Sequence, residues 1–360
     1  MQADPQRDEK IRRLLAGLSA NEAGLDLLRT TLAELGHRLM PRVEFMTLPE
    51  VTDATRLAMA RTGIILDTET TGLNPAEDKV IQLSMLHFTY DEQGIIKLGD
   101  LFDAYQDPGM PIPEEVTRIT GITQEMVDGR SIDEAEVSDF ISGVDMVVAH
   151  NAGFDRKFIE RAFPGASFAQ KDWHCSIEQI DWPARGERRG TLEMLALKAG
   201  FVYDAHNSRS DILATAFVLA NEMHEGKPSP FVEMLSAATL APHHIIALGS
   251  PFHAKEDLKA RGYRWAGDDE PVCGHRKVWH RVIPGTPEAM AEEAKFLDGV
   301  YGSPKNLPMF AYDGKTRYSD RQPERTPGFC TRTNLGLWER MQIEKDAPCG
   351  VLSAQGTLDI

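Results

Sequence analysis

The sequence predicts an α/β protein whose main domain is a mixed sheet flanked by helices. Three observations support this: strand-like segments come first, helix-like segments alternate with a further strand after them, and a strong turn joins two early strands. The predicted strands are 63–69, 80–90, 95–105 and 145–149, and the predicted helices are 113–119, 132–141, 153–162, 191–199 and 208–222. The turn is Asp91-Glu92-Gln93-Gly94, which is typical of a hairpin.

The rest of the 360-residue chain divides around this domain, which we expect at 61–226. Residues 1–60 form an N-terminal helical segment, since apolar residues recur at helical spacing between Ile11 and Leu35. That segment is either a layer on the main domain or a helix that binds a partner or a second copy. A linker at Lys227-Pro228-Ser229-Pro230 opens a small α+β module at 227–302. Residues 303–360 form either an extended wrap or a partly disordered tail.

Composition restricts the class of protein. Hydrophobic residues make up 42% and charged residues 26%, as in an ordinary globular protein. We expect a cytoplasmic protein without membrane contact, because no apolar stretch is long enough to cross a bilayer and the start lacks a signal-peptide pattern. The four cysteines are widely separated, which favours reduced thiols.

The net charge of −16 is unevenly distributed. Residues 251–360 contain 16 basic and 16 acidic side chains, so the whole excess lies in residues 1–250. Broad adhesion to nucleic acid needs a basic surface and is therefore disfavoured. A narrow phosphate site whose charge is reversed by bound cations stays open.

A pair of carboxylates ends the first predicted strand, in Ile64-Ile65-Leu66-Asp67-Thr68-Glu69. Side chains alternate along a strand, so Asp67 and Glu69 point the same way. Two adjacent anions are tolerated when a pKa rises or a cation binds. The pattern predicts a metal site.

Three further residues stand at the ends of predicted elements. Asp155 opens the helix after strand 145–149, His206 lies in the loop before helix 208–222, and Asp211 lies in its first turn. Alone, such residues are usually helix-capping, dipole-matching or solvated groups. Together with Asp67 and Glu69 they supply hard oxygen ligands for two Mg²⁺ or Mn²⁺ ions and an imidazole base. Two-metal phosphodiester hydrolysis uses all five.

This constellation resembles the three motifs of the DEDDh 3′–5′ exonucleases, the family of bacterial proofreading subunits and related repair enzymes. The motifs are Asp67-x-Glu69, Asp155 and His206-x4-Asp211, within about residues 61–225. The resemblance implies an RNase H-like exonuclease domain, two divalent ions and release of nucleoside 5′-monophosphates from a 3′ end.

The resemblance also implies roles for individual residues. Asp67 would bridge both ions, Glu69 and Asp211 would complete the first site, Asp155 would serve the second, and His206 would be the general base. Asn207 stands where a sister subgroup has tyrosine. The implied substrate-binding residues are Thr70, Gly72, Leu73, Ile122, Asn151 and Phe154. Thr120, Ser208 and Ile212 depart from residues common in the family, without touching a ligand position.

The expected substrate is a nucleic acid with a free 3′ end, DNA rather than RNA, with a polymerase or repair protein as a possible partner. Two alternatives stay open: an RNA or oligonucleotide exonuclease on the same fold, and a catalytically silent nucleic-acid-binding module. A metal-dependent nuclease assay on DNA and RNA separates them.

The C-terminal module contains an aromatic and basic run at 257–265 and a second run, Arg276-Lys277-Val278-Trp279. These resemble a small module attached to some bacterial exonucleases. The aromatic residues form either a stacking surface for single strands or the module's core. Cys273, His275 and His280 suggest zinc only faintly, and ordinary packing is the favoured interpretation.

Overall fold

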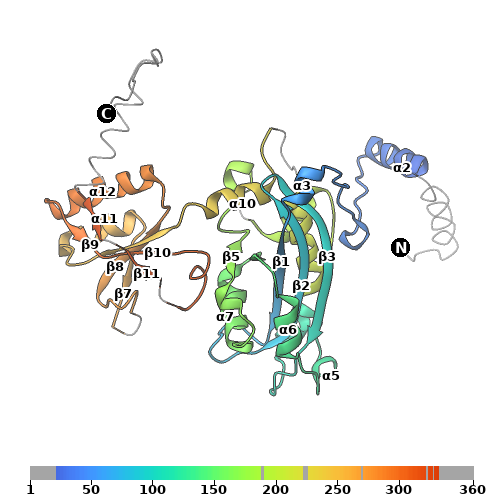
Figure 1. Ribbon diagram of the computed structural model, residues 1–360, viewed down its shortest axis with the longest axis horizontal. Helices are drawn as coiled ribbons and strands as arrows, with labels where there is room; N and C mark the ends of the chain where they lie inside the picture. Colours follow the sequence, from blue (N-terminus) through green and yellow to red (C-terminus); the bar gives the residue numbers. More distant parts are fainter. Residues whose placement is uncertain are drawn as a thin grey trace, which may run out of the picture.

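The computed structural model describes residues 22–187, 190–221, 226–268, 271–321, 323–326 and 328–331. Two five-stranded sheets form two units that lie side by side, connected near helix α10 (Pro230–Ala238) (Figure 1). The first sheet has the order β3-β2-β1-β4-β5 and the second the order β11-β10-β6-β8-β7.

The first sheet is mixed, as the sequence predicts. Its antiparallel part is the meander β1 (Arg61–Thr70), β2 (Val80–Asp91) and β3 (Gly94–Tyr105), and the predicted hairpin closes at Asp91 and Gly94. The strands β4 (Met146–Ala149) and β5 (Asp172–Cys175) run parallel to β1. The sheet is therefore mixed, with an antiparallel meander on one side of β1 and parallel strands on the other.

Helices cover both faces of the sheet. One face carries α6 (Glu134–Phe140) and α7 (Ala152–Ala162), and the other carries α8 (Leu192–Ala199), α9 (Ser208–Ala220) and α10. Along β1, Ile64 and Leu66 pack in the core beside α6 and α7, whereas Ile65 packs with α8, α9 and α10. The alternation therefore sends Asp67 and Glu69 to the α9 side and Thr68 to the α7 side.

Shorter elements complete the first unit and its N-terminal approach. They are α2 (Glu22–Glu34), η1 (Val43–Phe45), α3 (Ala54–Ala58), α4 (Glu114–Thr120), α5 (Gln124–Val127), η2 (Phe168–Gln170) and η3 (Pro183–Arg185). Helix α2 lies apart from both sheets (Figure 1). The predicted helical residues before 22 lie outside the described part of the chain. Among the described helices, none combines the length and the apolar character needed to cross a membrane.

The segment predicted as a linker is the start of α10. The Ser229 hydroxyl accepts a hydrogen bond from the backbone N–H of Val232 and so caps this helix, and Pro230 occupies its first turn. The ring of Phe231 lies 5.6 Å from that of Phe88 and 5.4 Å from that of Tyr90, centroid to centroid. Helix α10 thus packs on the first sheet, and the chain passes to the second sheet only after Thr239.

The second unit is an antiparallel sheet with two main helices. Its strands are β6 (His243–Ala247), β7 (Arg264–Ala266), β8 (Val278–Ile283), β10 (Met309–Ala311) and β11 (Glu324–Arg325), and β9 (Asn306–Leu307) pairs with β12 (Phe329–Cys330). The helical elements are η4 (Phe252–Ala254), α11 (Lys255–Ala260) and α12 (Pro287–Tyr301). Tyr263 and Trp279 are core residues, while Trp265 is exposed.

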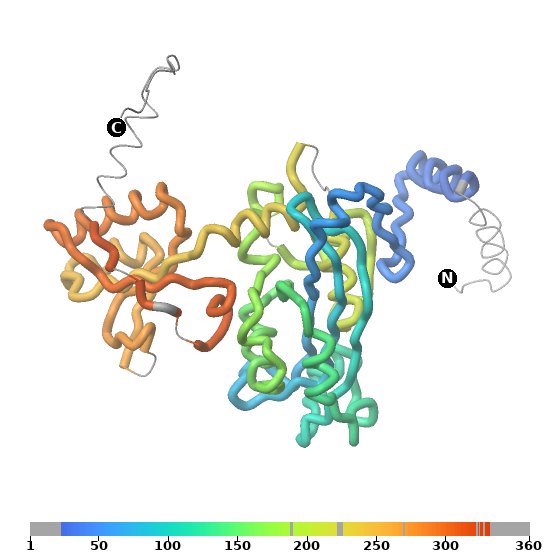
Figure 2. The backbone as a smooth tube through the Cα atoms, viewed as in Figure 1, coloured from blue at the N-terminus to red at the C-terminus, as the bar shows by residue number. Residues whose placement is uncertain are grey.

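In the segment predicted as an extended or partly disordered tail from residue 303, the described residues 306–330 supply four short strands. The predicted tail beyond 331 lies outside the described part. Loop 313–321 extends beside α7 (Figure 2). Arg156 of α7, with no exposed surface, donates to the carbonyls of Gly314 (2.9 Å), Lys315 (2.5 Å) and Arg317 (2.5 Å). Through these hydrogen bonds, loop 313–321 packs on α7 and connects the second unit to the first.

Candidate active site

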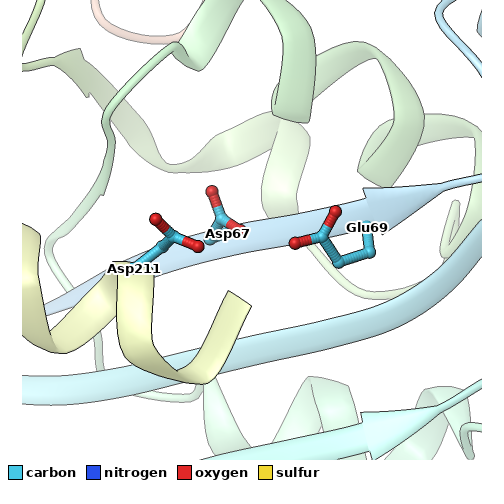
Figure 3. Close-up of side chains that lie close together, drawn as sticks. All are labelled: Asp67, Glu69 and Asp211. Atoms are coloured by element: carbon cyan, nitrogen blue, oxygen red, sulfur yellow. The ribbon is translucent and has the colours of Figure 1, made fainter. Parts of the chain in front are cut away.

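Three carboxylates meet at the end of β1. Asp67 and Glu69 project from the strand and Asp211 from the first turn of α9, so that all three border one space (Figure 3). Each offers an oxygen atom, and these atoms lie within 4.8 Å of one another. The strand register shifts between Glu69 and Thr70, where the ladder with β2 is interrupted.

Asp155 reaches the same region from α7. Its Oδ1 accepts hydrogen bonds from the backbone N–H of Thr68 (3.0 Å) and from the Thr68 hydroxyl (2.8 Å). The carboxylate is only 2% exposed. Asp155 is therefore buried and hydrogen-bonded to β1. It is not only a first-turn charge that caps or matches the dipole of its helix, which is the ordinary interpretation of such a position.

The start of α9 positions Asp211 and His206. The side chain of Asn207 accepts a hydrogen bond from Ser210 N (3.2 Å), and its backbone N–H donates to Asp211 Oδ2 (2.9 Å). His206 has a left-handed backbone with φ of 61°. Its ring is 60% exposed, and Nε2 lies 3.7 Å from Glu193 Oε1.

The four acids are buried close to one another, and this raises the pKa of each carboxyl group. Burial, reinforced by the charges of Asp155, Asp211 and Glu69, raises the pKa of Asp67 well above its ordinary value. Burial likewise raises the pKa of Glu69 to about 8, that of Asp155 to about 7 and that of Asp211 to about 6. Without a compensating cation, this group retains protons near neutral pH.

These carboxylates fit divalent ions by the chemistry of their donors. Hard, anionic oxygen ligands at the end of a strand are what Mg²⁺ and Mn²⁺ prefer. Asp67, Glu69 and Asp211 would hold one ion, with Asp155 beside it. By contrast, Cys273, His275 and His280 do not come together as a ligand group in the described part of the chain. His280 instead faces His244, with Nδ1 and Nε2 2.8 Å apart.

A cavity of about 470 Å³ opens over the carboxylates. Among the predicted substrate-binding residues, Asn151 and Phe154 line it. Thr70, Gly72, Leu73 and Ile122 do not belong to its lining. Leu73 is 84% exposed, whereas Ile122 is 1% exposed and packs with Ile81 and Val127.

Gly72 occupies a tight turn directly after β1. A Cβ there would lie 2.5 Å from the carboxylate of Asp78, which accepts hydrogen bonds from Thr71 and Asn74. The glycine allows this close approach.

The cavity also holds residues that the sequence interpretation missed. His150 follows β4, and its Nε2 donates to the Gly190 carbonyl (2.6 Å) while Nδ1 accepts from Ser176 (2.8 Å). Burial lowers the pKa of His150 to about 4, so the ring is neutral. Glu193 and Tyr203 border the same space. His150 had one signal in the sequence, its place at a strand end beside Asn151.

Comparisons with known proteins match the part of the chain that contains these residues. The family model described as "Exonuclease" (RNase_T) matches residues 64–219. The DNA polymerase III subunit epsilon of Treponema pallidum is 33% identical over 154 residues, 40% of this chain and 68% of that protein. The PolC-type DNA polymerase III of Listeria welshimeri is 30% identical over 175 residues, 45% of this chain but 12% of that protein. The chain thus spans only a small part of the PolC-type relatives.

A solved complex of Escherichia coli ExoI with single-stranded DNA is 18% identical, with a TM-score of 0.41 over 67% of this chain and 68% of that one. The epsilon-subunit match covers over two thirds of its relative, and the family model includes every acid of the cluster. The chain therefore belongs to the exonuclease family defined by that model.

Proposed function

We propose that this protein is a 3′–5′ exonuclease that uses Mg²⁺ or Mn²⁺ to release nucleoside 5′-monophosphates from DNA. The observation that carries the proposal is the convergence of Asp67, Glu69 and Asp211, with oxygen atoms within 4.8 Å, beside buried Asp155. Such a group is stable in its ionised form only with cations bound.

The chain's residues divide the work as follows. Asp67, Glu69 and Asp211 would hold one ion, and Asp155, oriented by Thr68, would serve a second. The two ions, when bound, stabilise charge on the attacking and leaving oxygens of the phosphodiester. His206 accepts the proton of the attacking water, and Glu193 orients its ring. Asn151 and Phe154 line the path of the terminal nucleotides.

DNA is the proposed substrate because the relatives with matching sequence are DNA polymerase III proteins. The same relatives make a DNA polymerase the proposed partner and the cytoplasm the proposed location. The domain division is likewise a proposal: an exonuclease unit that includes α10, and a C-terminal module that includes residues 306–330.

The test is digestion of a 5′-labelled oligodeoxynucleotide with Mg²⁺ or Mn²⁺. We expect stepwise shortening from the 3′ end, nucleoside 5′-monophosphates as products, and no reaction in EDTA. An RNA strand of the same sequence measures the preference for DNA. Binding of DNA without shortening in either metal would contradict the proposal and favour the silent binding module.

A further inference from the structure

A second cavity, of about 760 Å³, lies between the two units. The first unit contributes Gly153 and Lys157 of α7 and Glu178 of the loop after β5. The second unit contributes Arg264 of β7 and residues 280–282 of β8, and loop 313–321 contributes Arg317. The volume falls within the roughly 300–1,000 Å³ typical of ligand sites.

The lining of this cavity is cationic in a chain that is acidic overall. Lys157, Arg264, Arg281 and Arg317 line it, against one lining carboxylate, Glu178. Two of these cations form ion pairs with carboxylates that do not line the cavity. Lys157 lies 3.4 Å from Asp320, and Arg281 lies 2.6 Å from Glu293. Arg264 and Arg317 have no carboxylate within 4.0 Å among the described residues.

Arg317 is the less ordinary of these two. Its side chain is about 5% exposed, and Nη2 donates to the carbonyl of Leu240 (3.1 Å). Its Nε has no hydrogen-bond partner in the described part of the chain. Glu178 lines the same cavity but stays beyond ion-pair distance. Asp313 and Glu178 act on Arg317 only from beyond ion-pair distance, while burial lowers the pKa of its guanidinium. A buried guanidinium without a close ion pair is costly, so this position fits a bound anion.

The cavity is next to the active site. Asn151, Phe154 and Asp155 line the active-site cavity, whereas Gly153 and Lys157 of the same helix line this one. Likewise Ile177 borders the active site and Glu178 the second cavity. The first turn of α7 and the loop after β5 therefore form a wall that the two cavities share.

We propose that the cavity between the units binds the phosphodiester backbone of the single strand that leads into the active site. The inference rests on the proposed function, because it places the strand's 3′ end at the four carboxylates. Lys157, Arg264 and Arg317 contact phosphates. Tyr312 and Tyr318, which also line the cavity, offer rings for bases. Phosphate contacts combined with ring stacking are typical of single-strand sites.

The test compares Arg264→Ala and Lys157→Ala with Arg276→Ala. Arg276 is exposed on the same module and does not line the cavity, so it is a matched control for the loss of one charge. Each variant is assayed on a single-stranded oligodeoxynucleotide of about 20 nucleotides. Each is also assayed on the p-nitrophenyl ester of thymidine 5′-monophosphate, which fills only the active site.

We expect Arg264→Ala and Lys157→Ala to raise KM for the oligonucleotide roughly 3–10-fold, and to leave kcat and ester hydrolysis unchanged. In these two variants, the slope of log KM against the logarithm of the salt concentration should decrease by about 0.7 for each lost phosphate contact. Arg276→Ala should match the wild type on both substrates.

Equal effects of all three substitutions, or equal losses on ester and oligonucleotide, would overturn the cavity proposal. The failure of the proposed function itself looks different, because the wild type would then hydrolyse neither substrate. A wild type that hydrolyses both, with variants that change neither, refutes the cavity alone.

Discussion

Neighbouring residues of β1 serve opposite sides of the sheet. Asp67 and Glu69 point to α9 and join Asp211, while Thr68 points to α7 and binds Asp155. Two-residue periodicity therefore gathers four acids from three elements. Their proximity was predictable from the strand pattern and the family resemblance, but the Thr68 contact was not, because it depends on where α7 crosses the strand.

Replacing Asp67 with Asn should abolish turnover, by about 100-fold or more, and at the same time stabilise the metal-free protein at pH 8. The amide cannot ionise, so it avoids both the repulsion among the four acids and the cost of keeping Asp67 protonated, without changing side-chain size. Activity and melting temperature in EDTA check the two effects. Asp100→Asn, at an exposed acid of β3, is the control and should change neither. A less stable Asp67→Asn protein would contradict the electrostatic account.

The free energy of unfolding of the metal-free protein should fall as pH rises from 6.5 to 8. The pKa of Glu69 is about 8 and that of Asp155 about 7 in the fold, above their unfolded values, so the folded state binds more protons in this window. Buried His150 and His174, each with a pKa of about 4, have the opposite effect, but only below about 6.5.

Denaturant unfolding in EDTA at several pH values measures this slope, and Asp67→Asn should flatten it. A stability that rises across the same window would show that these carboxylates are already ionised in the metal-free fold.

His206→Ala should lower kcat by roughly 10²–10⁴-fold, as expected for loss of an acid–base group. The stabilisation of the protein by Mn²⁺ should persist, because His206 is 60% exposed and lies outside the carboxylate group. Thermal shift with Mn²⁺, measured beside activity, separates the two roles. Loss of both would assign His206 to metal binding.

At the scale of elements, the start of α9 determines where Asp211 lies. Asn207 caps the helix and also donates to Asp211 through its backbone. Asn207→Ala should reduce the free energy of unfolding by about 0.5–2 kcal/mol, while Asn207→Ser should keep most of the cap. Chemical denaturation checks this. Equal stability of the Ala and Ser variants would show that the cap contributes nothing.

The long strands and the hairpin were predictable because apolar alternation and a strong turn agree locally. Helix α10 was missed, although Ser229 and Pro230 are themselves signals of a helix start: a capping serine followed by proline. The prolines were interpreted as a break instead. Strand β5, Asp172–Cys175, was missed because four residues carry no period, and its pairing with β4 decides its conformation.

At the scale of the whole molecule, Arg156 connects the units. Arg156→Ala should cost about 3–5 kcal/mol, because it breaks a buried ion pair with Glu160 and removes three hydrogen bonds to carbonyls of loop 313–321. We expect calorimetry to show the two units melting separately. Arg118→Ala, at a surface pair that is 75% exposed on both sides, is the control and should have little effect. One unchanged transition would refute the coupling.

This association of the units was not predictable from sequence. Loop 313–321 has no periodicity, and Arg156 binds it through backbone carbonyls, which carry no sequence signature. The basic lining between the units was not predictable either, since Lys157 is far along the chain from Arg264, Arg281 and Arg317.

Asp155 and Arg156 are consecutive residues of α7, and one binds Thr68 beside the carboxylate cluster while the next faces loop 313–321. Trimming the chain to its exonuclease unit would remove every carbonyl that the Arg156 guanidinium contacts there, immediately beside Asp155. The shortest fragment with native activity should therefore extend through at least Arg321, well past the last strand of the catalytic sheet.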